Sequence, residues 1–381
     1  MTPQTVLPEQ RELFDIPEEI CYLNCAYMSP LLRSTVSAGR QGLERKSQPW
    51  NIRPPDFFST ARQIRSTAAT LFGSTADEIA IIPSASYGLA AAANNLSVGK
   101  GQKIVVLAEQ YPSNYYIWQA LAQRSGAVIH SVPRPGDGDW SSGILQALDG
   151  SAAIAALPHC HWSDGTLVDL ARIRDRLDET GGALVVDLTQ SLGAMEFDLG
   201  TIRPDFAVAA AYKWLLGPYA TGLLYVDPRH HQGQPLELPI FSRKNAVEFS
   251  DISYRDEFEP GACRFDVGEV GNFALLPALY DALQQLLKWQ VPRIQASLTE
   301  RTRAIAAAAG ALGLHVVDPA YRAPHFLGIR FPGGLPAGLA EHLRQQQVFV
   351  SIRGDSLRVT PYLYNTDDDL EKFVLALRAF V

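Results

Sequence analysis

The chain has 381 residues, of which 47% are hydrophobic and 19% are charged, and its formal net charge is −7. This composition excludes a disordered chain, a coiled coil and a collagen-like repeat, and the length predicts two domains. An acidic chain without a basic stripe is not expected to bind nucleic acid. The four cysteines form no CxxC pair, so neither a disulfide scaffold nor a zinc ribbon is expected. Because no long apolar run and no signal-peptide pattern occurs, we expect a cytoplasmic protein without a membrane partner.

Seven short apolar runs follow one another between residues 78 and 226, with segments of helical pattern between them. Their apolar residues are continuous rather than alternating, which is typical of strands buried on both faces of a largely parallel sheet. The alternation of strands and helices predicts an α/β fold. The expected strands are 78–82, 103–107, 127–132, 152–157, 183–187, 205–210 and 221–226, and the expected helices are 56–72, 112–125, 142–148 and 168–180.

The sequence changes character after about residue 230, where stretches rich in Gly, Pro and charge show no clear period. A long helix at 276–309, interrupted at Pro292, then begins a compact α+β unit of a size typical of a second domain. Further strands are expected at 315–317, 326–331, 348–351 and 356–360, and further helices at 337–347 and 367–380. We expect an N-terminal segment (1–50) that packs with the small domain, a large domain (51–270) and a small C-terminal domain (271–381).

Five of the expected strands end in polar or aromatic residues. Ligands of an open parallel sheet lie outside the carboxyl ends of its strands, so these residues are candidates for one site. After the first strand, a turn that contains Ala85 and Ser86 begins an Ala-rich helix, and its free N–H groups suit a phosphate. The other polar segments are 108–114, 159–165, 187–191 and 212–218.

Each of these features also has an ordinary structural interpretation. The small-residue turn could be a plain helix N-cap, Asp187 could cap a turn, and Lys213 could be a surface lysine. His159 and His161 have no third ligand at a suitable spacing, so we expect no metal site. Without a functional site, all of these ordinary interpretations would have to be correct at the same time to explain the five polar strand ends. A single functional site explains all five and is therefore favoured.

In this order and spacing, the motifs resemble those of the class V aminotransferase group of fold-type I enzymes, which depend on pyridoxal 5′-phosphate (PLP). The group includes cysteine desulfurases, isopenicillin-N epimerase-like proteins and kynureninases. The resemblance rests on the phosphate turn, on D-x-x-Q from Asp187, on K-W-x-x-G-P from Lys213 and on L-R-x-[ST] from Leu357, and it extends from Tyr22 to the C-terminal LRVTPYLYNT. It implies PLP as cofactor, a small amino acid as substrate, and a mostly parallel seven-stranded sheet in the large domain. It also implies a homodimer, in which the irregular stretch 235–268 is where a segment would reach the partner.

The resemblance assigns roles residue by residue. Lys213 matches the lysine that holds the cofactor covalently, and Asp187 matches the carboxylate that pairs with the pyridinium nitrogen and so keeps the ring an electron sink. The other matches are Gln190 at the 3′-oxygen of the ring, Tyr111 on the ring face, Ala85, Ser86 and Tyr212 at the phosphate, and Arg358 at the α-carboxylate of the substrate, with Arg353 as the next candidate for that carboxylate.

Several departures from the family pattern bear on the chemistry. Residues 345–355 contain no cysteine and leave no room for the loop that carries the desulfurase nucleophile, so persulfide chemistry is not expected. The Gly-Trp-x-Gly-His element of kynureninases is also absent. Trp162 stands where many relatives have an Asn beside the ring. Glu269 lies where relatives reach the partner's phosphate, and Asn272 is the alternative there.

Amino-group transfer is therefore the leading hypothesis, and epimerisation, lyase chemistry and kynureninase-like hydrolysis would use the same residues. A nicotinamide-dependent oxidoreductase is not supported, because no G-x-G-x-x-G follows a strand. A non-catalytic binding protein on the same fold would be expected to lack Lys213 or Asp187, and both are present. The motifs leave open the side chain of the substrate and the bond that is cleaved.

Overall fold

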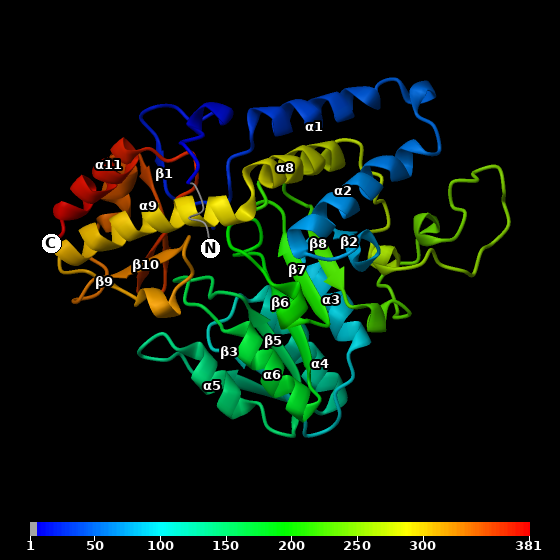
Figure 1. Ribbon diagram of the computed structural model, residues 1–381, viewed down its shortest axis with the longest axis horizontal. Coiled ribbons are helices and arrows are strands. Elements are labelled where there is room, and N and C mark those ends of the chain that lie inside the picture. Colours follow the sequence, from blue (N-terminus) through cyan, green and yellow to red (C-terminus); the bar gives the residue numbers. More distant parts are fainter. Residues whose placement is uncertain (1–5) are drawn as a thin grey trace.

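A seven-stranded sheet forms the centre of the molecule in the computed structural model, which describes residues 6–381 (Figure 1). Neighbouring strands are parallel, except that β8 is antiparallel to both β2 and β7. The predicted α/β class and its mostly parallel seven-stranded sheet are confirmed. Across the sheet, the strands are β2 (Ile79–Ile82), β8 (Gly222–Val226), β7 (Phe206–Ala210), β6 (Ala183–Asp187), β5 (Ala152–Pro158), β3 (Lys103–Leu107) and β4 (Val128–Val132).

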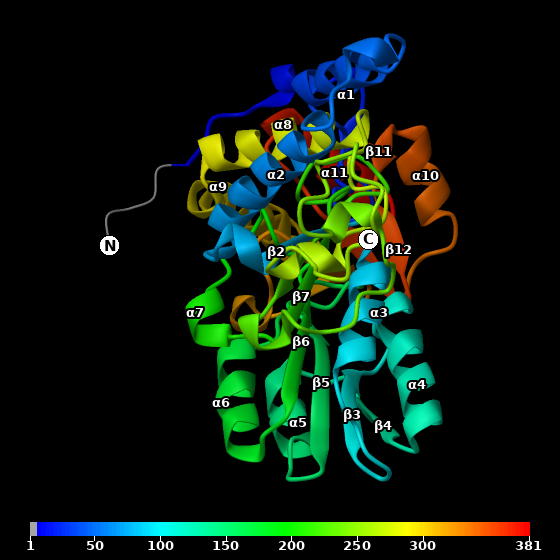
Figure 2. The same ribbon diagram turned by 90° about the vertical axis from the view of Figure 1, so that its right-hand side faces the viewer.

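Helices cover both faces of this sheet, and Figure 2 shows α5 and α6 on one side of the strands and α3 and α4 on the other. Successive side chains of a strand point to opposite faces, so Ile81 belongs to one apolar core and Ile82 to the other. This two-sided burial explains the continuous apolar runs. The covering helices are α3 (Ala85–Asn95) and α4 (Ser113–Ser125) on one face, and α2 (Asp56–Phe72), α5 (Trp140–Ala147), α6 (Leu170–Thr180) and α8 (Leu275–Trp289) on the other, with the short α7 (Leu199–Ile202) before β7.

A smaller unit with its own apolar core lies beside the large sheet, at the left of Figure 1. Its four-stranded sheet is antiparallel and consists of β12 (Ser351–Arg353), β13 (Ser356–Val359), β10 (Leu327–Arg330) and β9 (His315–Val316). The helices that pack on this core are α9 (Val291–Ala311), α10 (Leu339–Gln345) and α11 (Asp367–Arg378).

Residues 6–50 contact both units. Strand β1 (Cys21–Tyr22) pairs in parallel with β11 (Val348–Phe349) of the smaller unit. Helix α1 (Arg33–Arg45) instead packs along α8 of the large unit. None of the helices in residues 6–381 is long and apolar enough to cross a membrane.

Two predicted elements are divided in the structure. The expected helix 276–309 is two helices, α8 and α9, because Gln290 adopts a positive φ of 67° between them. Pro292 lies in the first turn of α9, where its missing N–H does no harm. The expected strand 348–351 is likewise two strands, β11 and β12, which belong to different sheets.

Candidate active site

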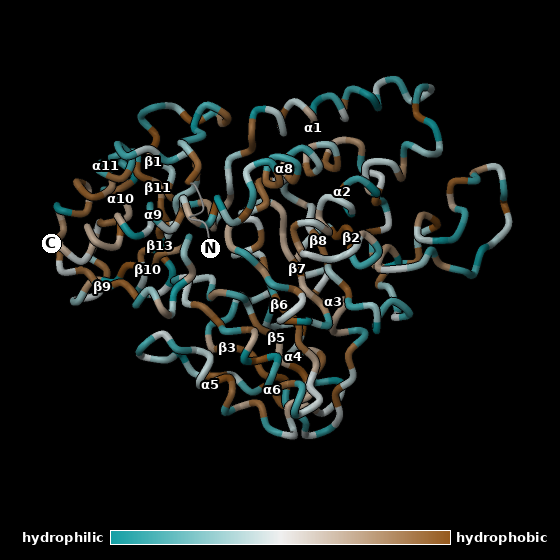
Figure 3. The backbone as a smooth tube through the Cα atoms, in the orientation of Figure 1, coloured by the Kyte–Doolittle hydropathy of each residue, from teal (hydrophilic) through white to brown (hydrophobic). Residues whose placement is uncertain are grey.

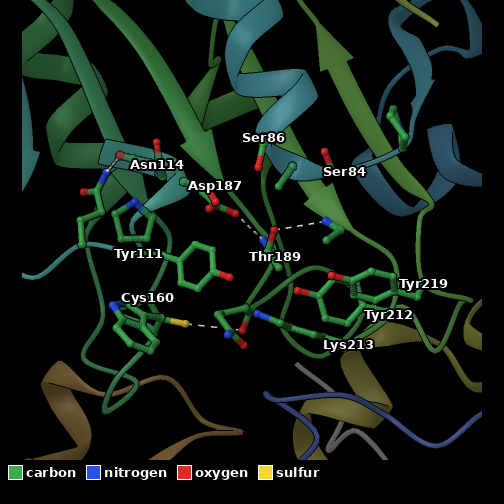
Figure 4. A pocket seen from close by; sticks show the side chains of 18 of the residues that line it. Ser84, Ser86, Tyr111, Asn114, Cys160, Asp187, Thr189, Tyr212, Lys213 and Tyr219 are labelled. Atoms are coloured by element: carbon green, nitrogen blue, oxygen red, sulfur yellow. Dashed lines mark hydrogen bonds between the residues drawn. The ribbon is translucent and has the colours of Figure 1, made fainter. Parts of the chain in front are cut away.

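A cavity of about 220 Å³ opens at the edge of the large sheet where five parallel strands end (Figure 4). Parallel strands bring their carboxyl ends to one edge, so residues far apart in the sequence meet there. Seven of the eight site residues expected from the sequence line this cavity, namely Ala85, Ser86, Tyr111, Asp187, Gln190, Tyr212 and Lys213. Arg358 does not line it.

A tight loop between β7 and β8 positions Lys213. The N–H of Gly217 donates to the carbonyl of Ala211 at 2.8 Å and closes this loop. The lysine is 6% exposed, and its amine points into the cavity. Burial and, to a smaller extent, the charge of Arg358 lower the pKa of Lys213 to about 8, while Asp187 opposes the shift. The amine therefore loses its proton near neutral pH, which suits both a nucleophile and a base.

Asp187, the last residue of β6, brings a carboxylate to the same cavity. The backbone N–H of Thr189 donates to Asp187 Oδ1 at 2.9 Å, and the Thr189 hydroxyl accepts from the N–H of Ala210 at 3.1 Å. These bonds tie the ends of β6 and β7 together. Burial raises the pKa of Asp187, whereas the Thr189 hydrogen bonds and the charge of Lys213 oppose the rise. A buried carboxylate of this kind suits a cationic ring nitrogen.

The fit of PLP to the cavity can be judged from the hydrogen-bond donors on its wall. Helix α3 begins at Ala85 with Ser84 as its N-cap, so the N-terminus of the helix faces the cavity with free N–H groups. Asn114 is buried, and its Oδ1 accepts from Trp118 Nε1 at 2.9 Å. Since an indole N–H can only donate, this bond fixes the amide, and Nδ2 is left without a partner among residues 6–381. This buried donor is available to a bound group with acceptor oxygens, which PLP provides.

Gln190 lines the cavity, but both ends of its amide already contact the protein. Its Nε2 donates to the carbonyl of Ala26 at 3.2 Å, and its Oε1 accepts from Trp214 Nε1 at 3.0 Å. Its backbone carbonyl accepts from His325 Nε2 at 2.6 Å. One hydrogen of Nε2 therefore remains for a ligand, and the other contacts hold the loop after β6 against three separate parts of the chain.

Aromatic side chains form much of the remaining wall. Tyr111 and Trp162 meet edge to face with their ring centroids 5.5 Å apart, and Lys213 Nζ lies 5.4 Å from the centre of the Tyr111 ring. Tyr212 and Tyr219 lie side by side, with centroids 4.7 Å apart. Burial raises the pKa of Tyr212 to about 12, so its hydroxyl keeps its proton at neutral pH. Trp162 thus gives the cavity an apolar wall.

Arg358 lies on β13 behind Trp162. It is 2% exposed; its Nη1 donates to the carbonyl of Trp162 at 3.0 Å and its Nη2 to Ser351 Oγ at 3.4 Å. Its Nε has no hydrogen-bond partner within residues 6–381. Burial and the neighbouring charge of Arg353 lower the pKa of Arg358 to about 9. A guanidinium held in this way keeps donors free for an anion.

Glu269 and Asn272 do not line the cavity of this chain. Asn272 caps α8, because its Oδ1 accepts from the N–H groups of Ala274 and Leu275 at 3.0 and 2.8 Å. Glu269 is exposed and borders a separate hollow beside Phe57.

Thr189, Cys160 and Asn114 line the cavity and lie in the polar strand-end segments, but the sequence motifs assign them no role. Thr189 lies inside the D-x-x-Q motif at a position that the motif leaves open, and Cys160 donates from Sγ to the carbonyl of Gln190 at 3.5 Å. Asn114 lies in the distorted first turn of α4, where φ is −93° and ψ is 22°. The sequence feature that could have identified Asn114 is its position three residues after Tyr111, in the same polar segment at the end of a strand.

The two histidines near the cavity bond to neighbouring serines. His159 Nδ1 lies 3.1 Å from Ser191 Oγ, and His161 Nδ1 lies 2.8 Å from Ser163 Oγ. Burial lowers the pKa of His159 to about 3 and that of His161 to about 4, so both rings are neutral near pH 7. In the described part of the chain, no group of three His, Cys, Asp or Glu side chains is placed to hold a metal ion.

Comparison with known proteins finds a match to the class-V aminotransferase family model over residues 55–373. An uncharacterized aminotransferase of Bacillus subtilis is 25% identical over 318 residues, which is 80% of each chain. A kynureninase of Deinococcus radiodurans is 28% identical over 300 residues, covering 72% of this chain and 68% of the kynureninase. The apo structure of a cysteine desulfurase from Thermococcus onnurineus superposes with a TM-score of 0.84 at 19% identity and covers 97% of both chains.

Proposed function

Because the chain belongs to the class-V aminotransferase family and is thus a PLP-dependent enzyme, we propose that it transfers the amino group of a small amino acid to a 2-oxo acid. The proposal rests on one feature of the cavity, which is a single amine with a pKa near 8. Burial keeps the thiol of Cys160 and the hydroxyl of Tyr212 protonated, because it raises the pKa of each well above neutrality. Amino-group transfer needs one base, which removes the proton from Cα of the substrate and returns it to a different carbon atom. Inversion at Cα is served by two bases, one on each side of Cα.

The residues around the cavity would divide the remaining tasks. Bound PLP supplies an electron sink for the electrons left at Cα. The carboxylate of Asp187 would hold the proton on the ring nitrogen, and the N–H groups of Ala85 and Ser86 would hold the phosphate. Lys213 would hold the cofactor and move the Cα proton.

Other residues would orient the ring and the substrate. Tyr111 would stack on the ring, the free Nε2 hydrogen of Gln190 would donate to the 3′-oxygen, and Tyr212 would contact the phosphate. Arg358 would take the α-carboxylate as a charge-assisted pair once the ligand reaches past Trp162. These assignments follow the family motif, and they are supported by the seven of the eight residues that line the cavity.

We also propose that the enzyme is a homodimer. The loop at 243–258 projects from the body at the right of Figure 1, and Figure 3 shows hydrophobic segments along it. Ile252 is 96% exposed, and Phe249 and Tyr254 are exposed beside it. Apolar side chains on a projecting loop are suited to cover a second copy of the chain.

The direct test combines visible absorption with chemical analysis of the products. Purified enzyme should have a visible cofactor band, and borohydride should fix the cofactor on the peptide that contains Lys213. A panel of amino acids should include at least one that converts the cofactor to its amine form and releases a 2-oxo acid, and a second 2-oxo acid should restore the band. Lys213→Ala should abolish the borohydride label, whereas Lys288→Ala, at an exposed position of α8, should not.

Three outcomes would contradict the proposal. Scrambled stereochemistry at Cα without the amine form would indicate epimerisation. Release of a side-chain fragment would indicate lyase or hydrolase chemistry. A chain that binds PLP but converts no amino acid in a broad panel would indicate a binding protein on this fold.

A further inference from the structure

Two arginines lie on the same face of the β12–β13 hairpin. Arg358 pairs across the antiparallel ladder with Ser351, and Arg353 is two residues further along β12. Side chains of paired residues and of residues two apart share a face, so Arg353 and Arg358 are diagonal neighbours, which lie roughly 7–8 Å apart in an antiparallel pair. The hairpin therefore presents two positive charges side by side.

Trp162 joins both arginines to the wall of the active-site cavity. Its carbonyl accepts from Arg358 Nη1 at 3.0 Å, and the guanidinium carbon of Arg353 lies 5.6 Å from the centre of its ring. Arg353 is fixed further because its Nη1 donates to the carbonyl of Ile352 at 2.8 Å. Trp162 itself lines the cavity, so both guanidinium groups contact a residue of the cavity wall.

Neither guanidinium forms an ion pair with a carboxylate of residues 6–381. The acidic groups nearby are already engaged by two other arginines. Arg134 pairs with Glu109 at 2.8 Å and with Asp164 at 2.6 Å. Arg330 pairs with Asp164 at 2.9 Å and with Asp355 at 3.2 Å. The charges of Arg353 and Arg358 are thus left without a partner beside the cavity.

The positive charges of Arg353 and Arg358 repel each other. Arg353 lowers the pKa of Arg358, and both guanidinium groups lower the pKa of Lys213, which shows that the three positive charges repel one another. Repulsion between like charges in a poorly solvated region is relieved by anions. One carboxylate would compensate one arginine and leave the other unpaired, so two are needed.

We propose that the substrate carries a second carboxylate on its side chain, which Arg353 binds while Arg358 binds the α-carboxylate. The preferred ligands are then acidic amino acids and the corresponding 2-oxo diacids. The proposal rests on the proposed function, since it names the substrate class of the same site.

The test compares ligands that differ only in the distal carboxylate. We would measure binding of glutamate and norvaline, and of 2-oxoglutarate and 2-oxopentanoate, by calorimetry on the holoenzyme. The two keto acids would also be measured on the cofactor-free protein, where binding does not depend on turnover. Wild-type protein should bind each diacid at least tenfold more tightly than its monoacid. Arg353→Gln should reduce this ratio to about one, because the diacids lose the partner of their distal carboxylate.

Two further variants keep the result interpretable. Arg378→Gln removes an exposed arginine at the end of α11 and should leave the ratio intact. Arg353→Lys preserves the positive charge and should retain part of the preference, which shows that the pocket remains folded. Equal binding of diacids and monoacids by the wild type, or an unchanged ratio in Arg353→Gln, would overturn the proposal. Conversion of norvaline without any diacid preference would leave amino-group transfer standing and refute only the second carboxylate site.

Discussion

Lys213 lies among charges of both signs, and its pKa reflects their balance. Arg353 and Arg358 favour the neutral amine, Asp187 favours the charged amine, and burial adds to the effect of the arginines. The resulting pKa of about 8 lies well below the ordinary value of 10.5. Single substitutions of these neighbours should therefore move the titration of the lysine in opposite directions.

We expect the reactivity of Lys213 toward an amine-labelling reagent in cofactor-free protein to rise with pH and to reach half its maximum near pH 8. Asp187→Asn removes the negative charge that raises the lysine pKa, so the midpoint should fall. Arg358→Met removes a positive charge that lowers it, so the midpoint should rise. Mass spectrometry of the peptide that contains Lys213 measures the labelling at each pH. A midpoint near pH 10, or one that neither substitution moves, would contradict this electrostatic account.

At the residue scale, the sequence predicts best the groups that stand at the end of a strand or within a few residues after it. Asp187 and Lys213 are of this kind, and the topology carries them to one edge. Asn114 was not predicted, because its role depends on a distorted helical turn and on Trp118, whose indole N–H already donates to the amide oxygen of Asn114. The position of Arg358 behind Trp162 depends on the packing of the hairpin against another unit, which no local pattern encodes.

At the scale of elements, the seven strands could be predicted because burial on both faces leaves a continuous apolar run. Helix α1 was not predicted, because its buried residues are Thr35 and Gly42 rather than large apolar side chains, and because glycine lets it approach the chain at the start of α8 closely. A Cβ at Gly42 would lie 1.8 Å from the carbonyl oxygen of Phe273. Close backbone approach of this kind gives no periodic signal in a sequence.

A second glycine governs how helix α3 meets the sheet. A Cβ at Gly88 would lie 2.7 Å from Val208 Cγ1 and 2.9 Å from Ile82 Cδ1. Gly88→Ala should therefore push the helix away and lower the free energy of unfolding by about 1–2 kcal/mol, because overpacking outweighs the better helix propensity of alanine. The affinity for PLP should fall as well, since the N-terminus of α3 shifts. Urea unfolding and a PLP titration measure the two effects.

Gly310 in α9 provides the matched control, because a Cβ there would contact nothing within 4 Å. Gly310→Ala should raise the free energy of unfolding by up to about 1 kcal/mol and leave PLP binding unchanged. A Gly88→Ala protein that gains stability to the same extent would show that α3 can move without cost.

At the scale of the whole molecule, the proposed dimer makes a mass prediction. Light scattering coupled to gel filtration should give twice the 41.7 kDa of one chain. Ile252→Asp combined with Tyr254→Asp should shift the protein toward the monomer, because charges would replace the exposed apolar side chains of the projecting loop. Leu375→Asp, at an exposed position of α11, should leave the mass unchanged. A wild-type protein that elutes as an active monomer would refute the proposal.

The pairing of the N-terminal segment with the smaller unit has a consequence for biosynthesis. Ser351 Oγ donates to Asn24 Oδ1 across 327 residues of sequence, and Cys21 and Tyr22 pair with Val348 and Phe349. At roughly 5–20 residues per second, the ribosome needs about 20–60 s to add the partner of a segment that emerged first. Residues 21–26 therefore lack these partners for most of translation. The contact of Ala26 with Gln190 becomes part of a complete cavity only after residues 348–351 have been synthesised. Cofactor capture should consequently be a late, post-translational event, and exposure of this early segment should make nascent chains clients for chaperones.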